Sequence, residues 1–199
     1  MLDRTIPFYN AILGCDHYQD REVVLPCGFS IVPYEKGFEK AWAELEYAIG
    51  DFDSLDEAED YFVKTYLQNQ AFFSNILFLV GPDKSVVGSC IAWQDKRQDT
   101  YVSSLYWLVV DEKYHGMGLG RALCCAVMDI YQAQESLPVY IHTQPWSWKA
   151  IFLYLSLGFK LQKSDSFSHY ENQYEAVMAT LKKVVAEEQI ALLEELSEP

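Results

Sequence analysis

The chain has 199 residues, of which 50% are hydrophobic and 15% aromatic, so it can bury the core of one domain and is not intrinsically disordered. Its formal net charge of −14 argues against nucleic acid or an anionic membrane as a partner and leaves cationic or neutral partners open. An acidic surface that serves only solubility explains the charge equally well.

The five cysteines form no CxxC pair and show no metal-type spacing with histidine. This pattern predicts reduced, buried thiols and no metal site, as is usual in the cytoplasm. The N-terminal residues lack a signal-peptide layout, and no apolar run approaches the length of a membrane span. We therefore expect a cytoplasmic protein, a monomer or homodimer, without a membrane partner.

The first half of the chain predicts two strands and two helices. A short strand is expected near residues 6–13, and residues 28–34 alternate like another. A helix follows because its apolar residues recur every three or four positions, and a second helix begins with a capping-box pattern at Ser54 and Glu57. The apolar faces comprise Phe38, Trp42, Leu45 and Ile49 in the first helix, and Leu55, Ala58, Phe62 and Tyr66 in the second.

The second half predicts a hairpin, a crossover and a helical tail. Strands are expected at residues 76–80, 86–93 and 101–110, with a polar turn at 95–100, and then at 138–143. A long helix at about 118–134 makes the last two strands a parallel, right-handed pair. A short helix at about 147–157 ends at Gly158, and residues 171–196 are mostly helical with a break near Ala186.

These elements predict one α+β domain over residues 1–199, with a mixed, mostly antiparallel sheet and helices on both faces. Residues 1–27 form an N-terminal extension, residues 28–159 the core, and residues 160–199 a C-terminal strand and helical segment.

Three alternating glycines, Gly116, Gly118 and Gly120, stand between a strand and a helix. Glycine permits backbone angles that point several N–H groups at one position, and a helix N-terminus attracts anions, so the turn predicts a phosphate ligand. A Walker-type loop requires Lys-Ser/Thr after its last glycine, where this chain has Arg121-Ala122. A dinucleotide fingerprint requires a third glycine at the position of Arg121, so both readings are disfavoured.

Two segments resemble a known family. Residues 110–123, with Tyr114-His115-Gly116-x-Gly118-Leu119-Gly120, resemble motif A of the GCN5-related N-acetyltransferase (GNAT) superfamily. Residues 150–159 (AIFLYLSLGF) resemble its motif B, A-x-x-L-Y-x-x-L-G-F. With the elements that join them, the motifs cover roughly residues 86–159. The resemblance implies the acyl-CoA N-acyltransferase fold and acetyl-CoA (coenzyme A) as co-substrate.

The resemblance also implies a cofactor site. The backbone N–H groups from His115 to Arg121 would hold the pyrophosphate, and the strand before the turn would pair with the pantetheine arm through a bulge. His115 replaces the family's usual Arg or Gln, and Ser147 replaces Asn in the segment N-x-x-A. The expected cofactor-binding residues are Leu108, Val109, Val110, His115, Gly116, Met117, Gly118, Leu119, Gly120, Arg121, Ser147 and Ala150.

The resemblance makes Tyr154 of motif B the general acid that protonates the leaving thiolate. A tyrosine that only packs between helix and sheet is the alternative for this residue. His142 is one candidate for the general base, and a structural histidine is equally consistent with its position. Asp95, Glu46 or a water chain are further candidates for the base. The splayed strand ends would present Trp93, Tyr106, Trp107, His142 and Gln144 near the acceptor. This set suits a cation or a planar group and is also ordinary core.

The leading hypothesis is an acetyl-CoA-dependent N-acetyltransferase that transfers an acetyl group to a primary amine by direct attack. The acceptor is a small-molecule or peptide amine, and the sequence leaves open another acyl donor or an O-acceptor. A non-catalytic acyl-CoA-binding sensor is the alternative from a different class.

Overall fold

The computed structural model describes residues 4–18 and 23–199. Their contacts group them into two compact units. The first unit contains residues 23–93 and 105–130, and the second contains residues 4–18, 94–104 and 131–199. Among the described residues, the chain passes between the units at residues 93–94, 104–105 and 130–131, within two strands and one helix.

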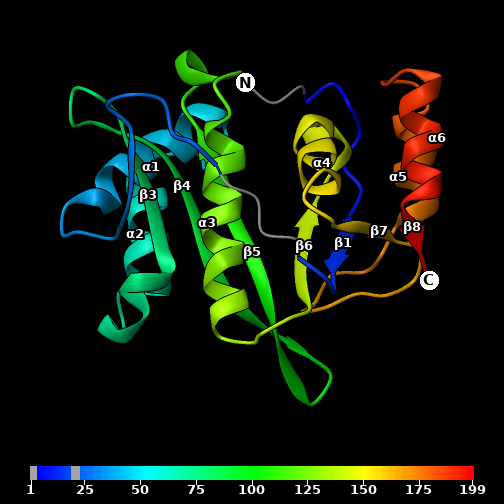
Figure 1. Cartoon of the computed structure of the whole chain (residues 1–199), viewed down its shortest axis with the longest axis horizontal. Helices are drawn as coiled ribbons and strands as arrows, with labels where there is room; N and C mark the ends of the chain where they lie inside the picture. Colours follow the sequence, from blue (N-terminus) through cyan, green and yellow to red (C-terminus); the bar gives the residue numbers. More distant parts are fainter. Residues whose placement is uncertain (1–3, 19–22) are drawn as a thin grey trace. The chain divides into compact units, whose positions relative to one another are not determined.

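The chain is mixed in secondary structure (Figure 1). Its strands are β1 (Ala11–Cys15), β2 (Ser30–Pro33), β3 (Ile76–Val80), β4 (Val86–Arg97), β5 (Thr100–Val110), β6 (Val139–Thr143), β7 (Lys160–Gln162) and β8 (Ser197–Glu198). Its α-helices are α1 (Phe38–Ile49), α2 (Leu55–Tyr66), α3 (Leu119–Ala133), α4 (Trp148–Leu155), α5 (Tyr174–Leu181) and α6 (Glu187–Glu195). Short 3₁₀ turns are η1 (Gln70–Asn75), η2 (Glu112–Tyr114) and η3 (Pro145–Ser147). Among the described residues, no helix is both long and apolar enough to cross a bilayer.

The sheet is mixed, as predicted, with the strand order β2-β3-β4-β5-β6-β1-β7-β8. Strands β2, β3 and β4 pair antiparallel, and the predicted parallel pairing of β5 with β6 is confirmed at residues 103 and 104. Strand β1 pairs antiparallel with both β6 and β7, and β8 adds a parallel edge. The α+β prediction is therefore correct.

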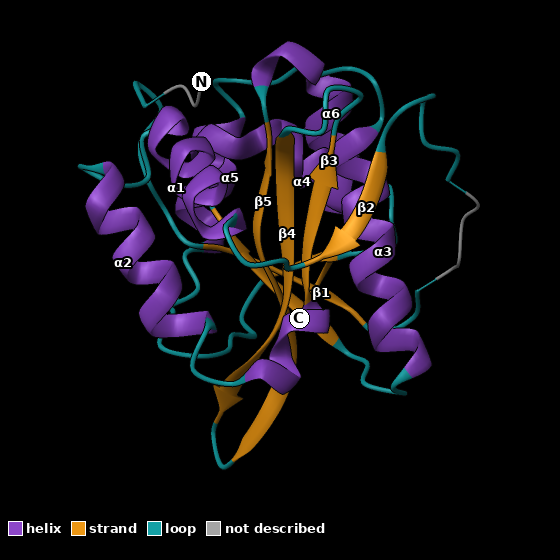
Figure 2. Cartoon of the chain, turned by 90° about the vertical axis from the view of Figure 1, so that its left-hand side faces the viewer, coloured by secondary structure: helices purple, strands orange, loops and turns teal. Residues whose placement is uncertain are grey.

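In the first unit, helices α1 and α2 lie on one face of strands β2–β5 and α3 lies on the other (Figure 2). Side chains along these strands point alternately to the two faces of the sheet, and helices pack on both faces. Phe78 of β3 belongs to a core cluster with Trp42 of α1 and Phe62 of α2, while Gly88 of β4 faces Leu123 of α3. Strand β3 and the first part of β4 are thus covered by apolar side chains on both sides, which explains their almost continuous burial.

The two predicted helices begin and end close to their expected positions. The Ser54 hydroxyl accepts from the Glu57 N–H at 3.2 Å, and the Glu57 carboxylate accepts from the Asp53 N–H at 3.2 Å, so the capping signal is confirmed. Leu55 was expected on the apolar face of its helix, and this was wrong. It is the first helical residue and is 44% exposed.

The predicted polar turn at residues 95–100 is too long, because β4 continues to Arg97 and β5 begins at Thr100. Strand β4 continues past the apolar core because its side chains there contact polar partners instead of apolar ones. Asp95 accepts from the Ser104 hydroxyl at 2.6 Å, and Arg97 pairs with Asp165. Alternate residues of this extension are half-buried and exposed, as a strand requires.

In the second unit, all five residues of β1 are buried, since the strand lies between β6 and β7. The N-terminal strand was expected five residues earlier, and this boundary was wrong. The helical tail breaks where predicted, because Ala186 precedes α6 and its N–H donates to the Gln189 side chain at 3.1 Å.

Gly88 generates the first prediction, because a Cβ added there would lie 2.7 Å from the Val109 carbonyl oxygen. We expect Gly88→Ala to lower the free energy of unfolding by about 1–3 kcal/mol, since backbone must shift to admit the methyl group. Gly14→Ala in β1 is the comparator, because its nearest atom is the flexible end of Gln162 at 3.0 Å. Urea unfolding measures both, and an equal loss in the two variants would contradict the steric argument.

Candidate active site

The glycine turn has the backbone conformation that its sequence predicts. Gly116 and Gly118 have φ values of 81° and 79°, in the left-handed region that favours glycine. A Cβ at either position would meet nothing within 4 Å, so the requirement is conformational and the space beside the backbone is open. This geometry lets N–H groups converge on one anion.

Helix α3 begins directly after this turn, at Leu119. Its Ala122 N–H donates to the Gly118 carbonyl at 3.0 Å, which is the first bond of helical type. The N–H groups of residues 119–121 therefore precede the helical ladder, where the helix dipole favours negative charge. Arg121 is half-buried on the first helical turn.

His115 does not join the N–H groups in the way its motif position suggests. Its backbone N–H donates to the Glu112 carbonyl at 3.2 Å, and its ring Nε2 lies 2.8 Å from the Val110 carbonyl oxygen. Both groups tie the turn to the end of β5. Within the chain, the His115 N–H and the Val110 carbonyl oxygen therefore each have a partner already.

Strand β5 is irregular at Trp107, which has a φ of 53°. Tyr106 and Trp107 both pack against the core cluster of the α1 and α2 face, although consecutive residues of a flat strand point to opposite faces. Such an interruption is typical of a β-bulge. The Ser89 hydroxyl donates to the Trp107 carbonyl at 3.2 Å, and Trp107 Nε1 donates to the Tyr66 hydroxyl at 2.7 Å. After the bulge, Leu108 and Val110 are half-buried and Val109 is buried.

Tyr154 lies on α4 in the second unit and is 5% exposed. Its ring packs against Phe159 at a centroid distance of 6.0 Å. Gly158 ends this motif with a φ of 96°, and an added Cβ would lie 3.3 Å from the His17 carbonyl oxygen. Ser147 precedes the helix, its hydroxyl accepts from the Gln144 amide at 3.0 Å, and Ala150 is half-buried.

His142 of β6 lies among different partners. Its Nε2 is 2.9 Å from Asn10 Oδ1, and Tyr170 stacks on its ring at a centroid distance of 3.7 Å. Burial lowers the pKa of His142 to about 4, and the nearby His169 adds to this effect. The imidazole is thus neutral at pH 7, with one nitrogen held by an amide and one ring face covered.

The family model described as acetyltransferase (GNAT) family matches residues 37–159. The chain belongs to this family. The match includes the glycine turn, the strand before it and Tyr154. A comparison with curated proteins gave no match.

Solved structures of GNAT proteins have the same fold. A GCN5-related N-acetyltransferase from Sphaerobacter thermophilus is 16% identical with a TM-score of 0.58, and the match covers 79% of this chain and 51% of that one. Glucosamine-6-phosphate N-acetyltransferase from Arabidopsis thaliana is 19% identical with a TM-score of 0.54, covering 71% and 97%. A GNAT acetyltransferase from Colwellia psychrerythraea is 12% identical with a TM-score of 0.59, covering 78% and 54%. This chain thus spans about half of two of these proteins.

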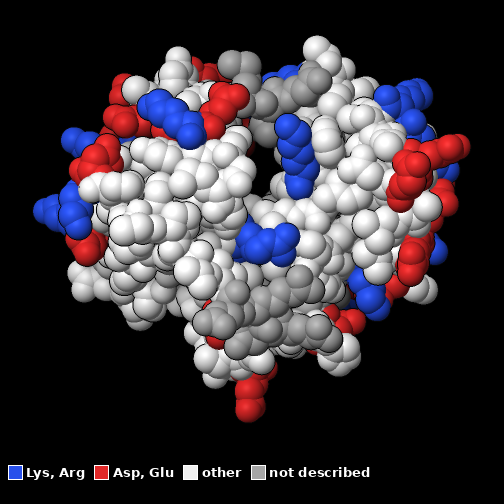
Figure 3. All heavy atoms as spheres, turned by 45° about the horizontal axis from the view of Figure 1, so that its top comes forward, with Lys and Arg blue, Asp and Glu red and all other residues white. Residues whose placement is uncertain are grey.

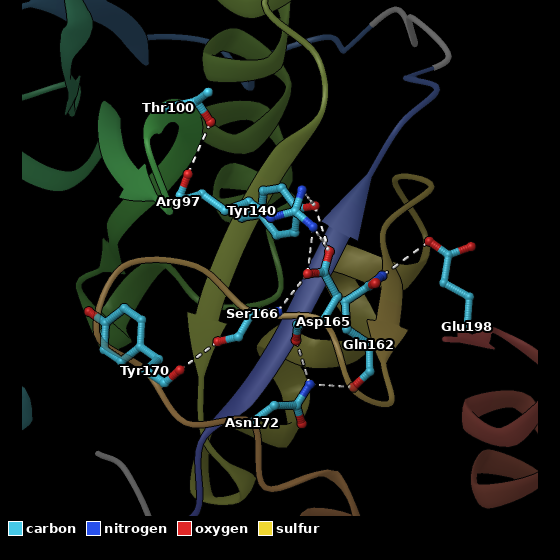
Figure 4. Close-up of polar contacts among 9 residues, drawn as sticks. All are labelled: Arg97, Thr100, Tyr140, Gln162, Asp165, Ser166, Tyr170, Asn172 and Glu198. Carbon is cyan, nitrogen blue, oxygen red and sulfur yellow. Dashed lines mark hydrogen bonds and ion pairs between the residues drawn. The ribbon is translucent and has the colours of Figure 1, made fainter.

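In this GNAT protein a network of polar side chains holds the segment that contains Tyr170 (Figure 4). Both Asp165 oxygens accept from Arg97 Nη2, at 2.5 and 2.6 Å. Tyr140 accepts from Arg97 Nη1 at 2.6 Å and donates to Asp165 at 2.8 Å. In the same segment the Ser166 hydroxyl donates to the Tyr170 carbonyl at 2.6 Å. The network therefore fixes the loop that delivers Tyr170 to the face of His142.

Most of this network left no signal in the sequence. Asp165 and Tyr170 come from a segment without periodicity, and Asn10 is far away along the chain. Arg97 was assigned to a turn. Among the described residues, no group of three or more His, Cys, Asp or Glu side chains is placed to hold a metal ion.

The surface charge does not single out one acidic patch on the face drawn in Figure 3. Acidic and basic side chains are interspersed along the margins of this face, basic side chains also lie near its centre, and uncharged residues cover much of the remaining area. The net charge of −14 therefore gives little information about a partner on this face.

His142 generates a pH prediction. Because its pKa falls from 6.5 to about 4 on folding, the unfolded chain binds the extra proton at intermediate pH. The neutral imidazole therefore favours the folded state fully above pH 6.5. As the pH falls toward 4, the free energy of unfolding decreases by on the order of 2–3 kcal/mol. Chemical unfolding of the wild type and His142→Gln from pH 7 to pH 4 measures this, with exposed His17→Gln as the control. Equal pH slopes in all three proteins would contradict a buried neutral histidine.

Proposed function

We propose that this protein transfers the acetyl group of acetyl-CoA to a primary amine by direct attack. The observation that carries the proposal is the glycine turn, in which two left-handed glycines precede the N-terminus of α3. Open space, backbone N–H groups ahead of the helical ladder and a positive helix end suit the pyrophosphate of coenzyme A. Family membership supports acyl transfer as the reaction class.

In the proposed reaction the neutral amine attacks the thioester carbonyl, a C–N bond forms, and the tetrahedral intermediate expels the thiolate as the C–S bond breaks. Tyr154 is the proposed acid that protonates the thiolate. Residues 116–121 and the backbone of residues 108–110 are the proposed donor-binding groups. Ser147 and Ala150 keep their proposed roles as cofactor contacts at the start of α4.

His142 remains a proposed base, since a neutral imidazole can accept a proton. Its amide partner and its stacking on Tyr170 are equally suited to a structural histidine. Asp95 already accepts from Ser104 at 2.6 Å. A non-catalytic acyl-CoA sensor is not favoured, because the matching family is one of acetyltransferases.

The direct test combines calorimetry with acetyl-CoA and a thiol-release assay over a panel of amines. We expect binding followed by amine-dependent release of coenzyme A. Binding without release for any amine would instead indicate a sensor, and no binding would overturn the proposal.

For the cradle, we expect Gly118→Ala to weaken acetyl-CoA binding at least about tenfold, because a left-handed alanine is strained and its methyl group enters the space of the anion. Gly37→Ala is the matched control, since Gly37 has a φ of 106°, also has open space, and lies at the start of α1. Calorimetry measures both affinities. Equal affinities in the two variants would contradict the assigned cradle.

For the acid, we expect Tyr154→Phe to lower kcat by roughly 10²–10⁴-fold and to leave acetyl-CoA affinity unchanged. Tyr131→Phe is the control, because it removes a buried hydroxyl that donates to the Ser104 carbonyl at 2.7 Å without a proposed chemical role. Initial rates against pH measure the effect. Wild-type turnover and an unchanged pH profile in Tyr154→Phe would exclude the acid role.

A further inference from the structure

Four aromatic side chains of the first unit form one mutual cluster. The rings of Trp42, Phe52, Tyr61 and Trp107 all contact one another, with centroid distances from 5.3 to 6.2 Å for the six pairs. They come from α1, the α1–α2 connection, α2 and the β5 bulge. Trp42 is fully buried, whereas the other three rings are partly exposed. This aromatic cluster therefore extends from the core to the surface.

A carboxyl group is buried one helical turn away from Trp42. Glu46 lies one helical turn after Trp42, on the same face of α1, and is 1% exposed. Within the described part of the chain, its Oε1 and the Trp42 Nε1 have no hydrogen-bond partner. A buried polar group without a partner costs about 1–3 kcal/mol, so packing alone does not account for Glu46.

Two tyrosine hydroxyl groups form hydrogen bonds with the cluster. Tyr66 accepts from Trp107 Nε1 at 2.7 Å and hydrogen-bonds with Tyr61. Burial of the Tyr66 hydroxyl is the main cause of its raised pKa, and the charge of Glu46 adds to this effect. Hydrogen bonds thus join Trp107, Tyr66 and Tyr61.

We propose that the aromatic cluster binds the amine acceptor, with its ammonium group against Glu46 and its carbon skeleton on Phe52, Tyr61 and Trp107. The substrate class is a hydrophobic primary amine, alkyl or arylalkyl. Aromatic faces attract organic cations, and a buried carboxylate supplies the opposite charge that an ammonium group requires. The inference rests on the proposed acetyl transfer for its reaction, while the binding of a cation is independent of it.

The surroundings favour a cation over an anionic acceptor. Asp51 follows α1 and adds negative charge near Glu46, and no basic residue belongs to the cluster as defined. Burial and Asp51 together raise the pKa of Glu46 well above its usual value.

The position of the cluster suits an acceptor. Trp107 precedes Val110 by three residues of β5, or about 10 Å of extended chain, and β5 leads into the glycine turn. The proposed acceptor and donor groups therefore belong to the same unit and share one strand.

Benzyltrimethylammonium, which cannot be acetylated, tests recognition alone. We expect it to quench tryptophan fluorescence of the wild type and to bind at least about tenfold more weakly to the isosteric variant Glu46→Gln. Glu44→Gln, on the exposed face of the same helix, should match the wild type. Absence of binding to the wild type, or equal affinities in Glu46→Gln and Glu44→Gln, would overturn the proposal.

A second pair of variants protects the test against misfolding of Glu46→Gln, which circular dichroism would reveal. Tyr61→Leu removes one partly exposed ring and should also weaken binding, whereas Tyr47→Leu removes an exposed ring elsewhere and should not. Equal binding by these two variants would overturn the proposal even if Glu46→Gln does not fold.

Turnover separates this proposal from acetyl transfer itself. With acetyl-CoA, 2-phenylethylamine should be a better acceptor than glucosamine 6-phosphate, and Glu46→Gln should raise the KM for the amine without changing acetyl-CoA affinity. Coenzyme A release that is indifferent to Glu46→Gln would reject the acceptor site and leave acetyl transfer standing. Cation binding without any release would reject acetyl transfer and leave the cation site standing.

Discussion

The left-handed backbone at Trp107 is the constraint on which the first unit depends. A bulky residue with positive φ is strained by on the order of 1–3 kcal/mol and persists only where its surroundings hold it. Here Ser89 binds its carbonyl group and Tyr66 binds its indole N–H. The bulge turns two consecutive aromatic side chains to one face and directs the end of β5 into the glycine turn. Local strain, aromatic packing and the proposed phosphate site therefore share one segment of backbone.

In the second unit a charged pair has a comparable role. Arg97 and Asp165 are partly exposed, so their attraction alone contributes little, but Tyr140 and the Asp165 carboxylate complete a closed set of short hydrogen bonds. The set holds the loop that places Tyr170 on His142. Covering the imidazole removes water from it, and the lost hydration explains why its pKa falls. The loop held by this set thus supplies part of the cover that lowers the pKa of His142.

The sequence predicted what is encoded locally. Helix periodicity, the Ser54 cap, the left-handed glycines and the crossover after β5 each depend on neighbouring residues, and each was confirmed. The missed features depend on contacts between distant residues. Strand β1 is a central strand only because β6 and β7 pair with it, and Arg97 lies in a strand because Asp165 is present to receive it. The inward position of Glu46 follows helix geometry, whereas the lack of a partner for its Oε1 among the described residues depends on how other segments pack.

The same distinction separates the two halves of the proposed reaction. Donor binding relies on backbone N–H groups, so any sequence that preserves the glycines and the helix start preserves it, and a short motif can identify it. Acceptor binding relies on side chains from α1, α2 and β5, and none of these has a fixed spacing in the sequence. A buried, unpaired carboxyl is informative here because its burial costs free energy that the fold does not recover. Glu46 therefore points to a cationic partner, just as the open glycine turn points to an anionic one.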